Sequence, residues 1–124
     1  MSKTYELRKI ISLLLEQTEG KAYYENSSDE ADFPYKVYSF ENIDLGDMER
    51  DDLILVVDIW GKDNVIEVEE IADSIENTFN CLNAPTTTSF PTFYRISRKP
   101  IEDEDKRIKR RQLKFQIQNY YKGA

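Results

Sequence analysis

The sequence contains no histidine, one cysteine and four glycines among its 124 residues. Without histidine, the chain lacks the commonest general base and the commonest ligand of transition metals. We expect no zinc site, because Cys81 alone cannot supply the ligands that such a site requires. A single cysteine also forms no internal disulfide, which is typical of a protein that folds in a reducing compartment.

Long apolar runs are also missing. The apolar stretch at residues 10–15 contains Ser12 and is far shorter than the ~20 residues that a membrane-spanning helix requires. We therefore expect neither a membrane span nor a signal peptide. The four glycines form no phosphate-binding motif either.

Charge is distributed unevenly along the chain. The formal net charge is −7, with 8 Lys or Arg against 20 Asp or Glu in residues 1–97 and 9 against 4 in residues 98–124. An acidic particle repels the phosphate backbone, which argues against general affinity for nucleic acid. Opposite charge at two ends of a small domain favours head-to-tail contacts between copies, and such contacts close into a ring where the rotation permits it.

The spacing of apolar residues predicts one domain over residues 1–124. Apolar residues recur at helical spacing over 4–18 and again after Asn64, which forms a capping box with Glu67. We read residues 44–47 as a turn, Gly61 as the end of a strand and residues 83–91 as a loop. Alternating or β-branched patterns predict strands at residues 21–24, 35–43, 52–60, 92–99 and 107–120.

These elements predict an α+β fold. We expect a mostly antiparallel or mixed sheet of four to five strands, with the two helices packed on one face. The last strand is apolar at odd positions and polar at even ones, so its outer face carries Gln112, Lys114, Gln116 and Gln118. Such a face requires water or a partner.

Two charged surfaces are candidates for a protein interface. An acidic face, which includes Glu70, lies along the second helix, and a basic patch opens the last strand; the patch consists of Lys106, Arg107, Lys109, Arg110, Arg111 and Lys114. Three interpretations of the basic patch are open: a solvated start of the strand, a contact for an acidic protein, or a contact for nucleic acid. Two are open for the acidic face, which is either solvated or docked on the basic patch of a second copy. The predicted interface residues are Glu69, Asp73, Glu76, Arg107, Lys109, Arg110, Arg111 and Lys114.

The remaining carboxylates suggest no reaction. Asp58 interrupts an apolar run, and we expect it to be a structural carboxylate paired with Arg95 or Arg98. The aspartates at 51, 52, 103 and 105 suit Mg²⁺ chemically, but turn chemistry explains them better. We therefore predict no catalytic residue, no metal site and no cofactor.

Four segments together resemble the tail terminator proteins, also called tail-completion or head–tail joining proteins, of long-tailed bacteriophages and prophages. The segments are residues 33–38 (FPYKVY), 52–61 (DLILVVDIWG), 67–75 (EVEEIADSI) and 104–117 (EDKRIKRRQLKFQI). The resemblance covers residues 5–121, whereas the acidic loop at 26–32 departs from the family pattern. The family has no fixed active-site residues.

The resemblance implies a non-enzymatic protein that assembles as a hexameric ring. The ring would cap the tail tube and join it to the head. Its partners would be further copies of itself, the tail-tube protein and a head-completion or connector protein, with DNA passing through without sequence-specific binding and no membrane contact. It would reside in the virion tail, and in the host cytoplasm during assembly.

Two other functions stay open from the sequence. One is a small nucleic-acid-binding or adaptor module that uses the basic strand at residues 106–114. The other is a carboxylate-dependent enzyme such as a nuclease, which the missing histidine disfavours.

Overall fold

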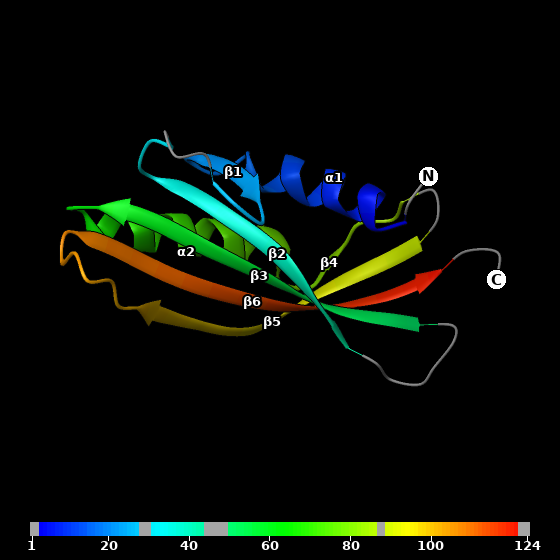
Figure 1. The fold of residues 1–124 in the computed structure, drawn as a ribbon. Coiled ribbons are helices and arrows are strands. Elements are labelled where there is room, and N and C mark those ends of the chain that lie inside the picture. Colours follow the sequence, from blue (N-terminus) through cyan, green and yellow to red (C-terminus); the bar gives the residue numbers. More distant parts are fainter. Residues whose placement is uncertain (1–2, 28–30, 44–49, 87–88, 122–124) are drawn as a thin grey trace.

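Six strands form one mixed sheet, and two helices pack on it (Figure 1). The computed structural model describes residues 3–27, 31–43, 50–86 and 89–121. The strand order across the sheet is β1-β2-β3-β6-β5-β4. The elements are α1 (Lys3–Leu15), β1 (Lys21–Tyr24), β2 (Tyr35–Ile43), β3 (Arg50–Lys62), α2 (Val65–Phe79), β4 (Leu82–Asn83), β5 (Ser89–Ile101) and β6 (Ile108–Tyr121).

Strand pairing is antiparallel except between β1 and β2, which run parallel. The α+β class and the mixed sheet are confirmed, but the predicted count of four to five strands is wrong. The additional strand is β4, which pairs with β5 through only Leu82 and Asn83. Two residues are too few to show the alternation by which a strand is recognised in sequence.

The hydrophobic core lies between one face of the sheet and the two helices. Across the three central strands, Leu55 pairs with Phe40 on one side and Phe115 on the other, so these side chains share a face. Both helices contribute to the same cluster, and the predicted apolar stripe of α2 is buried. The fully buried members from the helices are Leu7, Ile11, Leu15, Val68, Ile71, Ala72, Ile75 and Phe79.

The opposite face of the sheet, which we call the open face, carries the polar residues predicted for β6. Gln112 and Gln116 lie there beside Asp58 and Ile54 of β3. Gln116 donates a 2.8 Å hydrogen bond to Asp52, and Gln112 donates one of 3.3 Å to Asp58. Side-chain pairs between neighbouring strands thus satisfy much of the polarity of this face.

Three predicted boundaries need correction. Gly61 does not end β3, which runs to Lys62, and β5 begins at Ser89 within the expected loop. The first helix ends at Leu15 rather than residue 18, although the backbone amide of Glu16 still donates to the carbonyl of Ser12 at 3.0 Å. The turn predicted at residues 44–47 and part of the acidic loop, residues 28–30, lie outside the described residues. Asn64 caps α2 as predicted, accepting from the Glu67 amide at 3.1 Å.

The outer edge of β5 is only partly covered. Its pairing with β4 involves Thr92 and Phe93. A register shift between Arg95 and Ser97 marks a bulge, and Lys99 and Pro100 follow. Bulges, lysines and prolines are the features that discourage a sheet edge from pairing with a foreign strand. No helix in the described part of the chain is long and apolar enough to cross a membrane.

Candidate interaction surface

The structure brings most of the predicted basic patch into contact with acidic or aromatic groups of the same chain. Arg107 forms an ion pair with Asp105 at 3.0 Å, and Arg111 pairs with Glu69 of α2. Lys114 lies 4.0 Å from Glu41 of β2. Compensation within the chain lowers the positive potential that these residues present to a partner.

Arg110 stacks on an aromatic row that crosses the open face. Its guanidinium lies 3.7 Å from the ring centroid of Trp60, whose other neighbour is the nearly parallel ring of Tyr35 at 5.8 Å. Tyr35, Trp60 and Arg110 are successive partners across three strands, which explains the stack. Cation–π contact of this kind stabilises the sheet and covers the faces of the indole.

Asp58 is paired, but not with the predicted partners. Its carboxylate lies 3.9 Å from Arg110 and accepts from Gln112 at 3.3 Å. Arg95 and Arg98 lie on β5, where the register places them opposite Phe115 and Leu113 on the core face. The expected pairing is therefore wrong, because alternation directs these arginines to the other side of the sheet. Burial raises the pKa of Asp58, and Arg110 opposes that shift.

The acidic face of α2 forms ion pairs with β5. The Arg98 guanidinium contacts Glu69 at 2.6 Å, Asp73 at 2.7 Å and Glu76 at 2.9 Å. Arg95 pairs with Glu76 at 2.8 Å. We call Arg98 with its three acidic partners the α2–β5 ion-pair network. The three acidic residues predicted to form an interface thus all contact arginines of their own chain, and their role in an interface stays a prediction.

We expect Arg98→Met to lower the free energy of unfolding by about 1–2 kcal/mol. The Arg98 side chain is 18% exposed, so methionine replaces its stem but leaves three carboxylates less compensated. The loss should shrink at about 1 M salt, where screening weakens the repulsion among those carboxylates. Urea unfolding at low and high salt measures it, with Lys99→Met as the control on the same strand; equal stability of the two variants would contradict the prediction.

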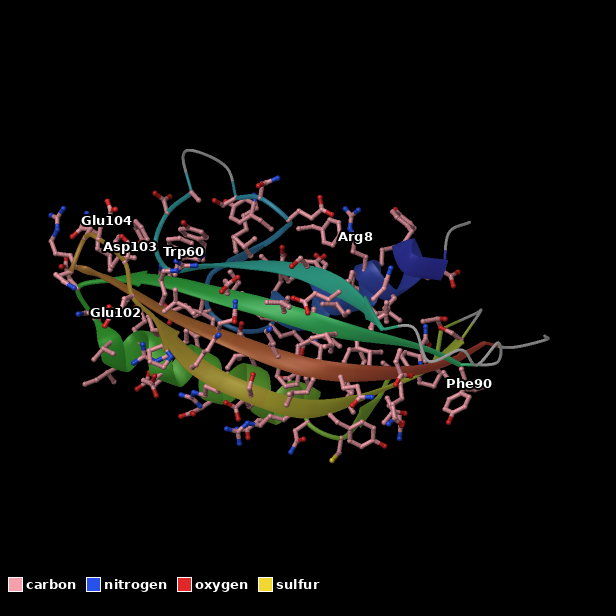
Figure 2. All side chains as sticks on the ribbon, turned by 60° about the horizontal axis from the view of Figure 1, so that its bottom comes forward. Arg8, Trp60, Phe90, Glu102, Asp103 and Glu104 are labelled. Atoms are coloured by element: carbon pink, nitrogen blue, oxygen red, sulfur yellow. The ribbon has the colours of Figure 1, made fainter. Side chains whose placement is uncertain are left out.

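A hollow of about 290 Å³ lies where α2 begins beside the β5–β6 turn. Its apolar wall comes from the start of α2 and from the facing ends of the two strands, and its rim is charged. Figure 2 shows Glu102, Asp103 and Glu104 of this turn gathered at the same end of the sheet as Trp60, with Phe90 at the opposite end. The lining residues are Val65, Pro100, Ile101, Glu102, Asp103, Lys106, Ile108, Lys109, Arg110 and Arg111.

Among the described residues, Lys106 and Lys109 are the members of the basic patch with no ion pair or hydrogen bond to another side chain. Both line the hollow. The sequence could not distinguish them from their neighbours, because which arginine meets an acidic residue depends on strand register and on the position of α2.

Sequence reasoning overlooked Lys36, which lies in β2 with no exposed surface. It pairs across the sheet with Ile59 and so points toward the core side. Its ammonium donates to the carbonyl oxygens of Leu15 at 2.7 Å and Glu19 at 3.1 Å. Leu15 is the last residue of α1 and Glu19 follows the helix, so neither carbonyl accepts a helical hydrogen bond from four residues further on, although Leu15 also accepts from the Thr18 hydroxyl at 2.7 Å. The sequence did hold one signal for Lys36, because this lysine occupies a position of the predicted strand whose side chain points toward the core.

Within the described residues, no group of three or more Cys, Asp or Glu side chains is arranged to hold a metal ion.

Comparison with known proteins gives similarity in structure but no family. No family model matches the chain, and no curated protein matches it. Among solved structures, the chain is similar to a chain of the "Virion of native gene transfer agent (GTA) particle", with a TM-score of 0.69 and 11% sequence identity. The similarity covers 94% of this chain and 90% of that chain. At this identity the similarity shows a shared fold.

Proposed function

We propose that this protein is a structural component of a phage-like particle, and specifically that it forms a ring that caps the tail tube and joins it to the head. The observation that carries the proposal is the similarity in fold over nearly the full length of both chains to a component of a gene transfer agent virion. The resemblance of four sequence segments to tail terminator proteins supports the same role independently. Function is thus attributed to docking rather than to a reaction.

In this role the protein would assemble as a hexamer on the tail and would contact the tail-tube protein below and a connector protein above. DNA would pass through the ring without sequence-specific contacts. The protein would be found in the virion tail, after assembly in the host cytoplasm.

Deleting the gene in the parent phage or prophage tests this role. We expect electron micrographs of the deletion mutant to show tails of uncontrolled length and heads without attached tails, and we expect the wild-type gene supplied in trans to restore both. Antibody labelling should place the protein at the head-proximal end of the tail. Normal tails joined to heads in the deletion mutant would contradict the proposal.

The pairing of Arg107, Arg111 and Lys114 with acidic residues of the same chain supports this role over a nucleic-acid-binding module. We expect fluorescence anisotropy with single- and double-stranded DNA to give a Kd weaker than about 100 µM at about 0.15 M salt, which is weaker than typical non-specific DNA binding. The opposite result would be tight binding that weakens steeply with salt and disappears when Arg107, Arg110 and Arg111 are replaced by alanine.

A further inference from the structure

We propose that the hollow between α2 and the β5–β6 turn is the socket for a second copy of this chain, and that the exposed ridge at the end of α1 fills it. The ridge consists of Leu13, Glu16 and Glu19, with Glu70 of α2 beside it. This inference rests on the ring proposed above and identifies the two surfaces that meet between its subunits.

The socket has an apolar floor that is open to solvent. Ile66, next to the lining residue Val65, is 67% exposed, and Val65 itself is 41% exposed. Val65 lines the hollow together with Ile101 and Ile108, and Ile66 adds exposed apolar surface next to it on the helix, so a partner seated here would remove apolar area from water.

The walls of the socket are held in place by backbone contacts. The amide of Asp63 donates to the carbonyl of Arg107 at 2.8 Å, which joins the segment before α2 to the start of β6. Within the turn, the backbone amide of Asp105 donates to the Asp103 carboxylate at 3.0 Å, and the backbone amide of Ile108 donates to the Asp105 carbonyl at 3.0 Å. A preformed socket requires little ordering when it is filled, and this lowers the cost of docking.

The ridge presents an apolar knob followed by acidic groups. Leu13 is 68% exposed. Because Glu16 continues the helical hydrogen bonding to Ser12, Leu13 and Glu16 are neighbours on one side of the helix. Glu19 and Glu70 line one shallow hollow between the end of α1 and α2. Glu16, Glu19 and Glu70 are exposed.

The ridge and the socket complement each other in shape and in charge. An exposed leucine suits an aliphatic socket, and three exposed glutamates suit a rim that carries Lys106 and Lys109. The rim also carries Glu102 and Asp103, so the match is directional: the glutamates of the ridge must meet Lys106 and Lys109, and docking in another alignment would bring like charges together. Because socket and ridge are different surfaces, the contact is head-to-tail and can close into a ring.

A reciprocal charge reversal tests the pairing. Variant A carries Lys106→Glu and Lys109→Glu, and variant B carries Glu19→Lys and Glu70→Lys. Sedimentation velocity at high protein concentration should show self-association of the wild type that weakens at least tenfold between about 0.1 and 1 M salt. Each variant alone should be monomeric, because its socket and ridge then carry the same sign. An equimolar mixture of A and B should associate again, since each socket meets a ridge of opposite charge.

Restoration in the mixture is the decisive readout, because two variants that had merely lost stability would not recover on mixing. Thermal unfolding of A and B establishes that both are folded. The control variant, Lys21→Glu with Lys99→Glu, makes the same change in net charge elsewhere and should associate like the wild type. Leu13→Asp should abolish association in the wild-type background.

Three results would overturn the assignment: a wild type that stays monomeric at every concentration, an unchanged association of variant A, or a mixture that fails to recover. The virion experiment above separates this inference from the proposed role. If the protein is present at the tail end but the reversals change nothing, the surfaces are wrong and the role stands. If the protein is absent from particles, the role fails whatever the protein does in solution.

Discussion

Replacing Gly61 with alanine is expected to lower the free energy of unfolding by about 2–3 kcal/mol, the largest effect we predict for a single methyl group. Gly61 is buried in β3, beneath α2. A Cβ atom at this position would lie 2.2 Å from Cγ2 of Val68. Real contacts between carbon atoms are far longer, so the helix or the strand would have to move. Urea unfolding monitored by circular dichroism measures the loss.

The partner residue supplies a sharper test. After Val68→Ala, the nearest atom that the new methyl would meet on that residue is its Cβ, at 3.7 Å, which is ordinary contact. Val68→Ala alone should cost about 2 kcal/mol through lost burial and a cavity. The double variant should be more stable than the sum of the two losses by at least about 1 kcal/mol. Additive losses would show that the close approach of Gly61 to Val68 is not the cause.

Replacing Lys36 with methionine is expected to lower the free energy of unfolding by about 2 kcal/mol at neutral pH. Two effects compete. Methionine relieves the cost of burying an ammonium group, but it removes the donor to the carbonyl groups of Thr18 and Glu19 and leaves the carbonyl of Leu15 with Thr18 alone. We expect the second effect to win, because several acceptors lose one shared partner at once. Lys99→Met, at an exposed position, is the matched control and should change stability by less than about 0.5 kcal/mol.

The pKa of Lys36 also predicts how the free energies of unfolding of the wild type and of Lys36→Met depend on pH. Burial lowers this pKa to about 8, against an ordinary value of 10.5, while Glu16 and Glu19 oppose the shift. Between these two values the unfolded chain binds more protons than the native one, so the native state gains stability as pH rises. The difference in free energy of unfolding between the wild type and Lys36→Met should therefore grow in favour of the wild type from pH 8 to 10.5 and stay constant below pH 8. A narrowing difference in that window would contradict the assignment.

The sequence predicted elements that repeat a pattern and missed those that depend on a single contact. The stripe of α2 and the alternation of β6 both extend over many residues, and their burial is as predicted. Gly61 was misread because its role depends on Val68, a residue on another element. Asp58 received the wrong partners because the order β3-β6-β5 places β6, and not β5, next to it. The role of the charged residues in an interface stays a prediction, and their compensation within the chain was not foreseeable without the strand register.

The irregular edge of β5 has a consequence for how copies of this chain meet at high concentration. A strand that is bent at Arg95–Ser97 and ends in Lys99 and Pro100 is a poor template for continuous backbone pairing. Copies are thereby discouraged from joining edge to edge into fibrils. Contact between copies is left to side chains, and such contacts can form, dissociate and form again.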